Sequence, residues 1–129
     1  LNTQQKALNG SKILIIGVAY KKNVDDVRES PALDIIKLLE SAGVKISYFD
    51  PFVKYLNLYQ NRYKSLFELT KEQIKKTDAV VIITDHDQIN FNLILNSASL
   101  IVDTRDVFPD VKQSNLFKLG VGEVKPTKL

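Results

Sequence analysis

Three basic side chains and a helix start lie close together near the beginning of the sequence. Lys21, Lys22 and Arg28 supply positive charge within eight residues. Ser30 followed by Pro31 is typical of a helix start, because serine caps free backbone N–H groups and proline has none to lose. The free N–H groups of a helix start also favour anions. This spacing favours a loop that binds phosphate.

The same stretch carries an aromatic side chain and three acids. Tyr20 offers a flat, partly polar surface that can pack on a base or a sugar. Asp25, Asp26 and Glu29 can instead neutralise the basic side chains, which would leave a solvated loop without a ligand. We interpret Asp25 and Asp26 as organisers of the loop rather than as catalytic acids. The residue types alone leave both hypotheses open.

A second polar group, Asp85-His86-Asp87, follows an apolar run. Imidazole between carboxylates can serve acid–base chemistry or hold a metal ion. The chain has one His and no Cys, so thiolate sites are excluded and the histidine stands alone. We therefore predict no metal site. We interpret the group as a helix cap and polar rim, with Asp87 capping a helix that runs through Asn96.

Two further charged residues come shortly after apolar runs. Arg105 has a planar guanidinium fork that suits phosphate or ribose oxygens. The alternative for Arg105 is an ion pair with Asp103 or Asp106. Asp50 stands where a dinucleotide site would carry its ribose-binding acid, but we interpret it as a turn former before Pro51.

Apolar runs bounded by turn-forming residues predict strands that are buried on both faces. They cover residues 12–17, 44–49, 79–84 and 100–103, with 117–121 as a fifth candidate. Strands that alternate with helices predict a Rossmann-like open α/β fold, a mainly parallel sheet with helices on both faces. The ligand crevice of such a sheet lies beyond the carboxyl ends of its strands. That edge comprises residues 18–30, 50–53, 84–87 and 103–108.

Helical patterns stand between the apolar runs. The spacing of apolar residues over 31–42 predicts a helix that ends at Gly43. Capping-box patterns at 65–68 and 70–73 predict two short helices. The stretch 52–64 shows no regular pattern.

A single glycine, Gly17, ends the first predicted strand. A dinucleotide fingerprint would place Gly-x-Gly-x-x-Gly there, so that bare backbone could approach a pyrophosphate. Val18, Ala19 and Tyr20 follow instead, so NAD binding by this loop alone is disfavoured.

The composition is that of one soluble globular domain: 129 residues, 44% hydrophobic, 26% charged, net charge +3. The apolar runs are too short to cross a bilayer. Basic residues are scattered and do not interleave with aromatics, so neither a membrane nor a nucleic acid is an expected partner. The absence of Cys and of a secretory leader is compatible with a cytoplasmic protein.

The string GVAYKKNVDDVRESP over residues 17–31 is similar to the signature of the C-terminal domain of the UDP-glucose/GDP-mannose dehydrogenase family. The resemblance continues through YFDP at 48–51, TDH at 84–86 and VDTR at 102–105. The sequence of these motifs most resembles that of family members that oxidise UDP-N-acetylhexosamines such as UDP-N-acetylglucosamine. The resemblance implies that residues 10–129 are the UDP-sugar-binding domain of a longer chain. Residues 1–9 would then be the end of an interdomain helix.

The resemblance also implies roles for single residues. Tyr20 and Lys21 would contact the nucleotide sugar, and Arg105 would hold its UDP portion. Arg28 would face the pyrophosphate of NAD, which a missing N-terminal domain would bind. The residues that organise the loop would be Asp25, Asp26 and Ser30.

The family reaction is a two-step, NAD-dependent oxidation of the sugar C6 hydroxyl to a carboxylate, through a thiohemiacetal on a Cys. This chain has no Cys, so the resemblance implies a fragment that is not catalytic alone. Its partners would be a UDP-sugar, the missing N-terminal and central domains, and further copies in a homo-oligomer. The competing hypothesis is a free-standing α/β interaction or regulatory module whose loop charges contact a protein.

Overall fold

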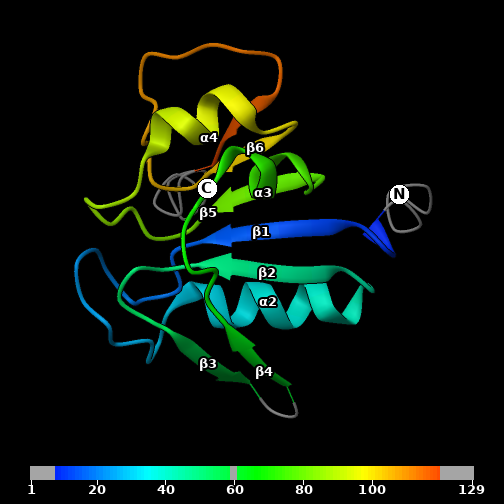
Figure 1. Cartoon of the computed structure of the whole chain (residues 1–129), viewed down its shortest axis with the longest axis vertical. Coiled ribbons are helices and arrows are strands. Elements are labelled where there is room, and N and C mark those ends of the chain that lie inside the picture. Colours follow the sequence, from blue (N-terminus) through cyan, green and yellow to red (C-terminus); the bar gives the residue numbers. More distant parts are fainter. Residues whose placement is uncertain (1–7, 59–60, 120–129) are drawn as a thin grey trace, which may run out of the picture.

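The computed structural model describes residues 8–58 and 61–119 (Figure 1). Five strands form one parallel sheet in the order β2-β1-β5-β6-β7. Their bounds are β1 (Lys12–Ile16), β2 (Lys45–Phe49), β5 (Ala79–Ile82), β6 (Ile101–Asp103) and β7 (Leu116–Lys118). The predicted Rossmann-like sheet is confirmed. The fifth strand begins one residue before the predicted start, and residues 120–121 of that prediction lie outside the described residues.

Helices cover both faces of the sheet. Strand β1 alternates between them, because successive side chains of a strand point to opposite faces. Ile15 packs in one buried cluster with Ile36 of α2 (Pro31–Ser41). Leu14 packs in a second cluster with Ile74 of α3 (Lys71–Lys75) and Ile94 of α4 (Phe91–Ser97). The predicted layers, helix on sheet on helix, are therefore present.

Helix α2 begins and ends as the sequence predicts. The Ser30 hydroxyl accepts the N–H of Ala32 at 3.1 Å, and Pro31 occupies the first turn. Gly43 follows the helix with φ of +83°, the left-handed conformation that glycine adopts without strain. The helix therefore starts directly at the end of the basic loop.

A β-hairpin occupies the stretch for which no regular pattern was found. Strand β3 (Tyr55–Leu58) pairs antiparallel with β4 (Asn61–Lys64). Leu56 and Leu58 are buried and join the same cluster as α2. In Figure 1 the hairpin projects from the α2 side of the sheet. Its short strands extend the core beyond the parallel sheet.

Two of the predicted helix starts are wrong. Ser65 does not cap a helix, because its hydroxyl accepts the backbone N–H of Asp50 at 2.9 Å. Helix α4 begins after Asn90 rather than Asp87, since the Asp87 carboxylate is bonded to the Asn23 side chain at 2.8 Å. The capping box at 70–73 does begin α3, and both of its bonds are formed.

The strand order reverses at β1, which lies between β2 and β5. Open α/β sheets bind ligands outside the carboxyl ends of the strands, at the point where the strand order reverses. The segments that follow β1 and β5 meet there, and the arrowheads of Figure 1 point to this edge. In the described part of the chain, no helix combines the length and hydropathy needed to cross a bilayer. The helix predicted over residues 1–9 falls almost wholly outside the described residues.

Candidate functional site

The segments after β1 and β5 approach each other closely at the switch point. Gly17 has φ of +82°, and a Cβ placed on it would lie 2.3 Å from the Thr84 carbonyl oxygen. The Thr84 hydroxyl donates to the Ala19 carbonyl at 2.6 Å. Glycine is therefore required here by backbone angle and by space, and the loop after β1 begins in contact with the segment that follows β5.

Asp50, at the end of β2, is buried and holds the start of this loop. Its Oδ2 accepts the N–H groups of Val18 at 2.8 Å and Ala19 at 3.2 Å. Its Oδ1 accepts the N–H of Phe52 at 2.8 Å, which is the turn-forming bond expected before Pro51. One carboxylate oxygen of Asp50 thus forms the predicted turn, and the other binds the backbone at the start of the loop after β1.

This arrangement does not fit a dinucleotide in the β1–α2 loop. The N–H groups of Val18 and Ala19 are bonded to Asp50 and are not free to approach a pyrophosphate. Asp50 is itself 2% exposed, so its carboxylate is not open to a ribose hydroxyl. An NAD site in this loop is therefore disfavoured by geometry as well as by the missing glycines.

His86 is fully buried, so the interpretation as a helix cap and polar rim is wrong. Its Nε2 lies 2.9 Å from Asp50 Oδ2, and its Nδ1 accepts the N–H of Asn23 at 2.7 Å. The Phe52 ring packs against it with centroids 4.8 Å apart. Both ring nitrogens are thus bonded within the protein. Among residues 8–58 and 61–119, no group of three ligating side chains is arranged to hold a metal ion.

Asp85 joins two cationic side chains at the edge of the sheet. Lys22 Nζ lies 3.8 Å from its Oδ2, and Arg105 Nε lies 3.6 Å from its Oδ1. Asp85 Oδ1 is buried and makes no hydrogen bond with the described residues. Arg105 therefore pairs with neither acid predicted from sequence, because Asp103 instead accepts its backbone N–H at 3.0 Å.

A pocket of about 330 Å³ opens beside these charges, beyond the carboxyl ends of β5, β6 and β7. Its volume lies within the range of small-molecule sites. Both basic and acidic side chains line it, and Asp103 is the acid already bonded to backbone N–H groups. The lining residues are Lys22, Asp85, Asp103, Thr104, Arg105, Asp106, Lys118 and Leu119.

The remaining predicted residues lie on the outer part of the loop. Tyr20 is 51% exposed, Lys21 is exposed, and neither lines this pocket. Asp25 is exposed and has no hydrogen bond or ion pair with any described residue. The structure therefore brings Arg105 to Lys22, and it leaves Tyr20 and Lys21 facing solvent.

Arg28 is held by Asp26 through two side-chain hydrogen bonds. Arg28 Nε lies 3.0 Å from Oδ1, and its second terminal nitrogen lies 2.9 Å from Oδ2. These bonds, together with the backbone N–H of Arg28, lower the pKa of the Asp26 carboxyl to about 2. The guanidinium itself is largely exposed. Asp26 therefore orients a cation that remains open to a partner.

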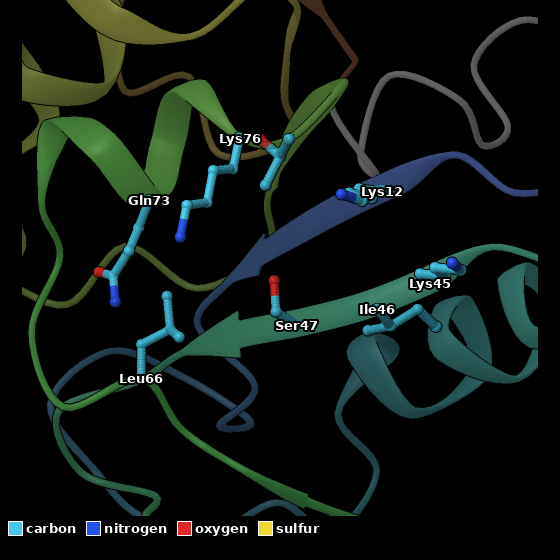
Figure 2. A pocket seen from close by; sticks show the side chains of 8 residues that line it. Lys12, Lys45, Ile46, Ser47, Leu66, Gln73 and Lys76 are labelled. Carbon is cyan, nitrogen blue, oxygen red and sulfur yellow. The ribbon is translucent and has the colours of Figure 1, made fainter.

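A second pocket, of about 310 Å³, lies at the other end of the sheet (Figure 2). Lys12 and Lys45 are the first residues of β1 and β2, and Lys76 follows α3. Figure 2 shows Ser47 of β2 pointing to the same side as Leu66, Gln73 and Lys76, whereas the Ile46 side chain points towards α2. None of the predicted site residues lines it, so it provides matched lysines for control experiments.

The sequence pointed to this edge of the sheet and to Lys22 as part of a phosphate-binding loop, but it assigned Asp85 and His86 only to a helix cap and polar rim. Asp85 and His86 follow a buried strand, and Lys22 stands in the basic loop. Strand topology placed all three at the edge. Asp50 and His86 meet across 36 positions, and the Asn23–His86 and Lys22–Asp85 contacts each span 63, so a single sequence gives no signal for them.

The parallel strand order and the helices on both faces of the sheet define the class: a Rossmann-like α/β domain. Residues 14–110 match the UDP binding domain of the UDP-glucose/GDP-mannose dehydrogenase family, and the chain belongs to this family. The family resemblance expected from residues 17–31 is confirmed.

The names of the individual relatives differ in the substrate that they give. The chain is 38% identical over 76 residues to a UDP-N-acetyl-D-mannosamine dehydrogenase from Methanococcus maripaludis, covering 59% of this chain and 16% of the relative. It is 35% identical over 108 residues to a UDP-glucose 6-dehydrogenase from Rickettsia prowazekii, covering 78% of this chain and 25% of the relative. The chain thus spans between 16% and 25% of the length of these curated relatives.

A solved structure supports the same assignment. The UDP-N-acetyl-mannosamine dehydrogenase from Staphylococcus aureus has a TM-score of 0.62 at 27% identity, covering 92% of this chain and 28% of that one. A UDP-D-ManNAc dehydrogenase from Pyrococcus horikoshii has a TM-score of 0.67 at 24% identity, covering 95% of this chain and 29% of that one. The second comparison bears on the fold alone.

Proposed function

We propose that this chain binds the nucleotide part of a UDP-sugar at the carboxyl edge of its sheet. The observation that carries the proposal is the pocket in which Arg105 and Lys22 flank one carboxylate, Asp85. A diphosphate offers oxygens to a guanidinium fork and to an ammonium group. The two ion pairs with Asp85 are 3.6 and 3.8 Å long, so they can exchange for phosphate contacts at small cost.

The exposed part of the loop completes the proposed site. Tyr20 and Lys21 would lie against the nucleotide sugar, as an aromatic surface and a charge. Arg28 would contact the pyrophosphate of NAD bound by another part of a longer protein. Asp26 supports this role by orienting the guanidinium of Arg28.

Asp25 and Ser30 complete the set of loop-organising residues. The support for Ser30 is a bond from its hydroxyl to the Ala19 carbonyl at 3.3 Å, which ties the helix start to the loop. Asp25 has no such bond with a described residue, so its assignment rests on its position in the loop.

We further propose that residues 10–129 are one domain of a longer NAD-dependent UDP-sugar 6-dehydrogenase. That protein would oxidise the C6 hydroxyl of a UDP-N-acetylhexosamine to a carboxylate. It would act in the cytoplasm, in polysaccharide biosynthesis, and as a homo-oligomer. The names of the relatives and the fraction of them that this chain spans support the proposal. The chain has no Cys and its first loop does not fit NAD, so it contributes substrate binding rather than the oxidation step.

A titration of the 129-residue chain with UDP tests the binding proposal. We expect amide NMR shifts in residues 18–30 and 103–106, with weak affinity. Arg105→Ala or Lys22→Ala is expected to weaken binding by about tenfold or more, the cost of one charge-assisted contact. Lys21→Ala is expected to weaken it less, because Lys21 lies outside the pocket.

The matched control is Lys45→Ala, which removes the same charge from the pocket at the other end of the sheet. Its UDP affinity should equal that of the unaltered chain. An equal loss in Lys45→Ala would mean that net charge alone attracts the nucleotide. The absence of shifts in millimolar UDP would refute the proposal and favour the interaction-module hypothesis.

A further inference from the structure

The buried pair Asp50 and His86 is bonded to both ends of one short segment, residues 20–22. The two amides just before the segment donate to Asp50 Oδ2 at 2.8 and 3.2 Å. The amide just after it, that of Asn23, donates to His86 Nδ1 at 2.7 Å. Asp50 and His86 are themselves joined at 2.9 Å. The segment that carries Tyr20, Lys21 and Lys22 is therefore held at its two ends by a single buried unit.

The bonds of His86 define its tautomer. A backbone N–H can only donate, so Nδ1, which meets the Asn23 amide, must accept and carries no proton. The ring proton is then on Nε2, which donates to Asp50 Oδ2. One neutral tautomer satisfies both bonds, and the opposite tautomer satisfies neither.

The surroundings of the pair keep it rigid. His86 is 0% exposed and Asp50 is 2% exposed. The Phe52 ring packs on the imidazole, and the Ser65 hydroxyl accepts the N–H of Asp50. A buried polar group that loses its partner is costly, because water cannot replace the lost bond. The pair is thus fixed by the core rather than by the solvent-exposed loop.

Asn23 is shaped to present its amide to the ring. Its φ is +62°, a left-handed conformation that asparagine tolerates better than most residues. Its side chain is bonded twice to Asp87, at 2.8 and 3.0 Å. The left-handed turn at Asn23 and the bond to His86 therefore occur at the same point of the chain, where the segment 20–22 ends.

We propose that His86, as the Nε2–H tautomer, is a positioning residue for the proposed UDP-sugar site. Together with Asp50 it forms a clamp, defined here as the Asp50–His86 pair and its bonds to the amides of residues 18, 19 and 23. The clamp fixes the path of residues 20–22 at the carboxyl edge before a ligand binds. His86 acts through the loop and does not touch the ligand. This role rests on the proposed function, whereas the clamp itself is measurable without UDP.

The first test is the tautomer. His86 is the only histidine of the chain, so long-range ¹H–¹⁵N NMR spectra report on it without assignment ambiguity. We expect the neutral Nε2–H form at pH 7.5 in the absence of ligand, with a slowly exchanging Asn23 amide. A Nδ1–H form, a charged ring, or an Asn23 amide that exchanges as fast as an exposed one would overturn the proposal.

The second test uses two variants of His86 that each keep one bonding position. The carboxamide of His86→Asn can reach the place of Nδ1 and accept the Asn23 N–H, while that of His86→Gln reaches the place of Nε2 and keeps the donor to Asp50. We expect His86→Asn to retain UDP affinity within about threefold, and His86→Gln to lose about tenfold. Amides 20–22 should exchange faster in His86→Gln only.

A residue with a structural role alone would behave differently. Both variants would then lose unfolding stability and UDP affinity together, without separating at the loop amides, and that result would overturn the proposal. The matched control is Thr77→Val, which deletes a buried side-chain hydrogen bond to the Ile74 carbonyl at the other end of the sheet and leaves the clamp unchanged. It should bind UDP as the unaltered chain does. If neither His86 variant folds, the tautomer measurement on the unaltered chain decides.

Failure of this inference can be told apart from failure of the proposed function. If the unaltered chain does not bind UDP, the proposed function falls, and the tautomer and amide exchange still test the clamp. If it binds UDP and His86→Gln binds equally well, the clamp has no positioning role while the proposed function stands.

Discussion

At the scale of single residues, a comparison of two glycines separates the destabilisation caused by a left-handed backbone from that caused by a steric clash. Gly17 and Gly10 have nearly equal φ, +82° and +87°. A Cβ on Gly17 would lie 2.3 Å from the Thr84 carbonyl oxygen, whereas a Cβ on Gly10 meets nothing within 4 Å. The two positions therefore share the conformational penalty and differ in the steric one.

We expect Gly17→Ala to lower the free energy of unfolding by about 3–4 kcal/mol, the sum of a left-handed alanine and an overpacked contact. Gly10→Ala should lower it by about 1–2 kcal/mol, because only the conformational term applies. Urea unfolding followed by circular dichroism measures both. Equal losses in the two variants would show that the segment after β5, which contains Thr84, moves to make room for the added methyl group.

The residues of the candidate site were predictable from sequence to different extents. Arg105 and the loop cations could be predicted, since basic residues after buried strands fall at the carboxyl edge of a parallel sheet. The burial of Asp50 and His86 could not, because their side chains meet across 36 positions and Asn23 lies 63 positions from His86. A single sequence shows residue types but not which of them meet.

At the scale of elements, the β1–α2 loop contains the ion pair of Asp26 with Arg28, which lowers the pKa of the Asp26 carboxyl. The side-chain hydrogen bonds from Arg28, and then its backbone N–H, lower the pKa of Asp26 from 3.8 to about 2. Because the pKa of Asp26 is lower in the folded than in the unfolded chain, the contribution of the ion pair to folding stability is fully present above the unfolded pKa of 3.8. It is lost as the pH falls from about 4 towards 2. The loop should therefore keep Arg28 oriented throughout the neutral and mildly acidic range.

Arg28→Ala is expected to raise the pKa of Asp26 towards 3.8 while the backbone N–H of residue 28 still limits the rise. Side-chain carboxyl ¹³C shifts followed between pH 1.5 and 6 measure this directly. Lys21→Ala serves as the control and should leave the Asp26 titration unchanged. A midpoint near 3.8 in the unaltered chain would contradict the paired geometry.

Elements that depend on local signals were predicted well, and those that depend on distant contacts were not. Helix α2 has its cap, its proline and its terminal glycine within 14 residues, and all of them act as expected. The pattern at 65–68 has the same kind of cap, but Asp50 takes the Ser65 hydroxyl from 15 residues away. Strand β3 of the hairpin has alternating burial, but the sequence that joins it to β4 has no glycine to mark a turn.

At the scale of the whole molecule, strand β1 joins two buried clusters. Leu14 belongs to the cluster of α3 and α4, and Ile15 belongs to that of α2. Both side chains are 0% exposed. Because one strand contributes to both faces, loss of packing on either face should weaken the entire sheet.

Leu14→Ala and Ile15→Ala are each expected to lower the free energy of unfolding by about 2–5 kcal/mol. Each variant should still unfold in one transition, with the same midpoint by circular dichroism and by tyrosine fluorescence. Phe67→Ala is the control, since Phe67 is 97% exposed and its loss should change stability by no more than about 0.5 kcal/mol. Two separated transitions would show that the faces fold independently.

The architecture as a whole followed from the alternation of apolar runs and helical patterns, which predicts a parallel sheet with covered faces. The order β2-β1-β5-β6-β7 was not available from the same pattern. Each apolar run can pair with any other, and the choice is made by packing against the helices. The switch point therefore became visible only in the structure.

The clamp holds residues 20–22 through backbone amides on either side, and their own side chains take no part in it. Selection can therefore exchange Tyr20, Lys21 and Lys22 while the chain keeps its course over the sheet. The surface offered to a ligand changes and the scaffold does not. Divergence in substrate preference needs such a position, and libraries randomised at these three codons should yield mostly folded proteins.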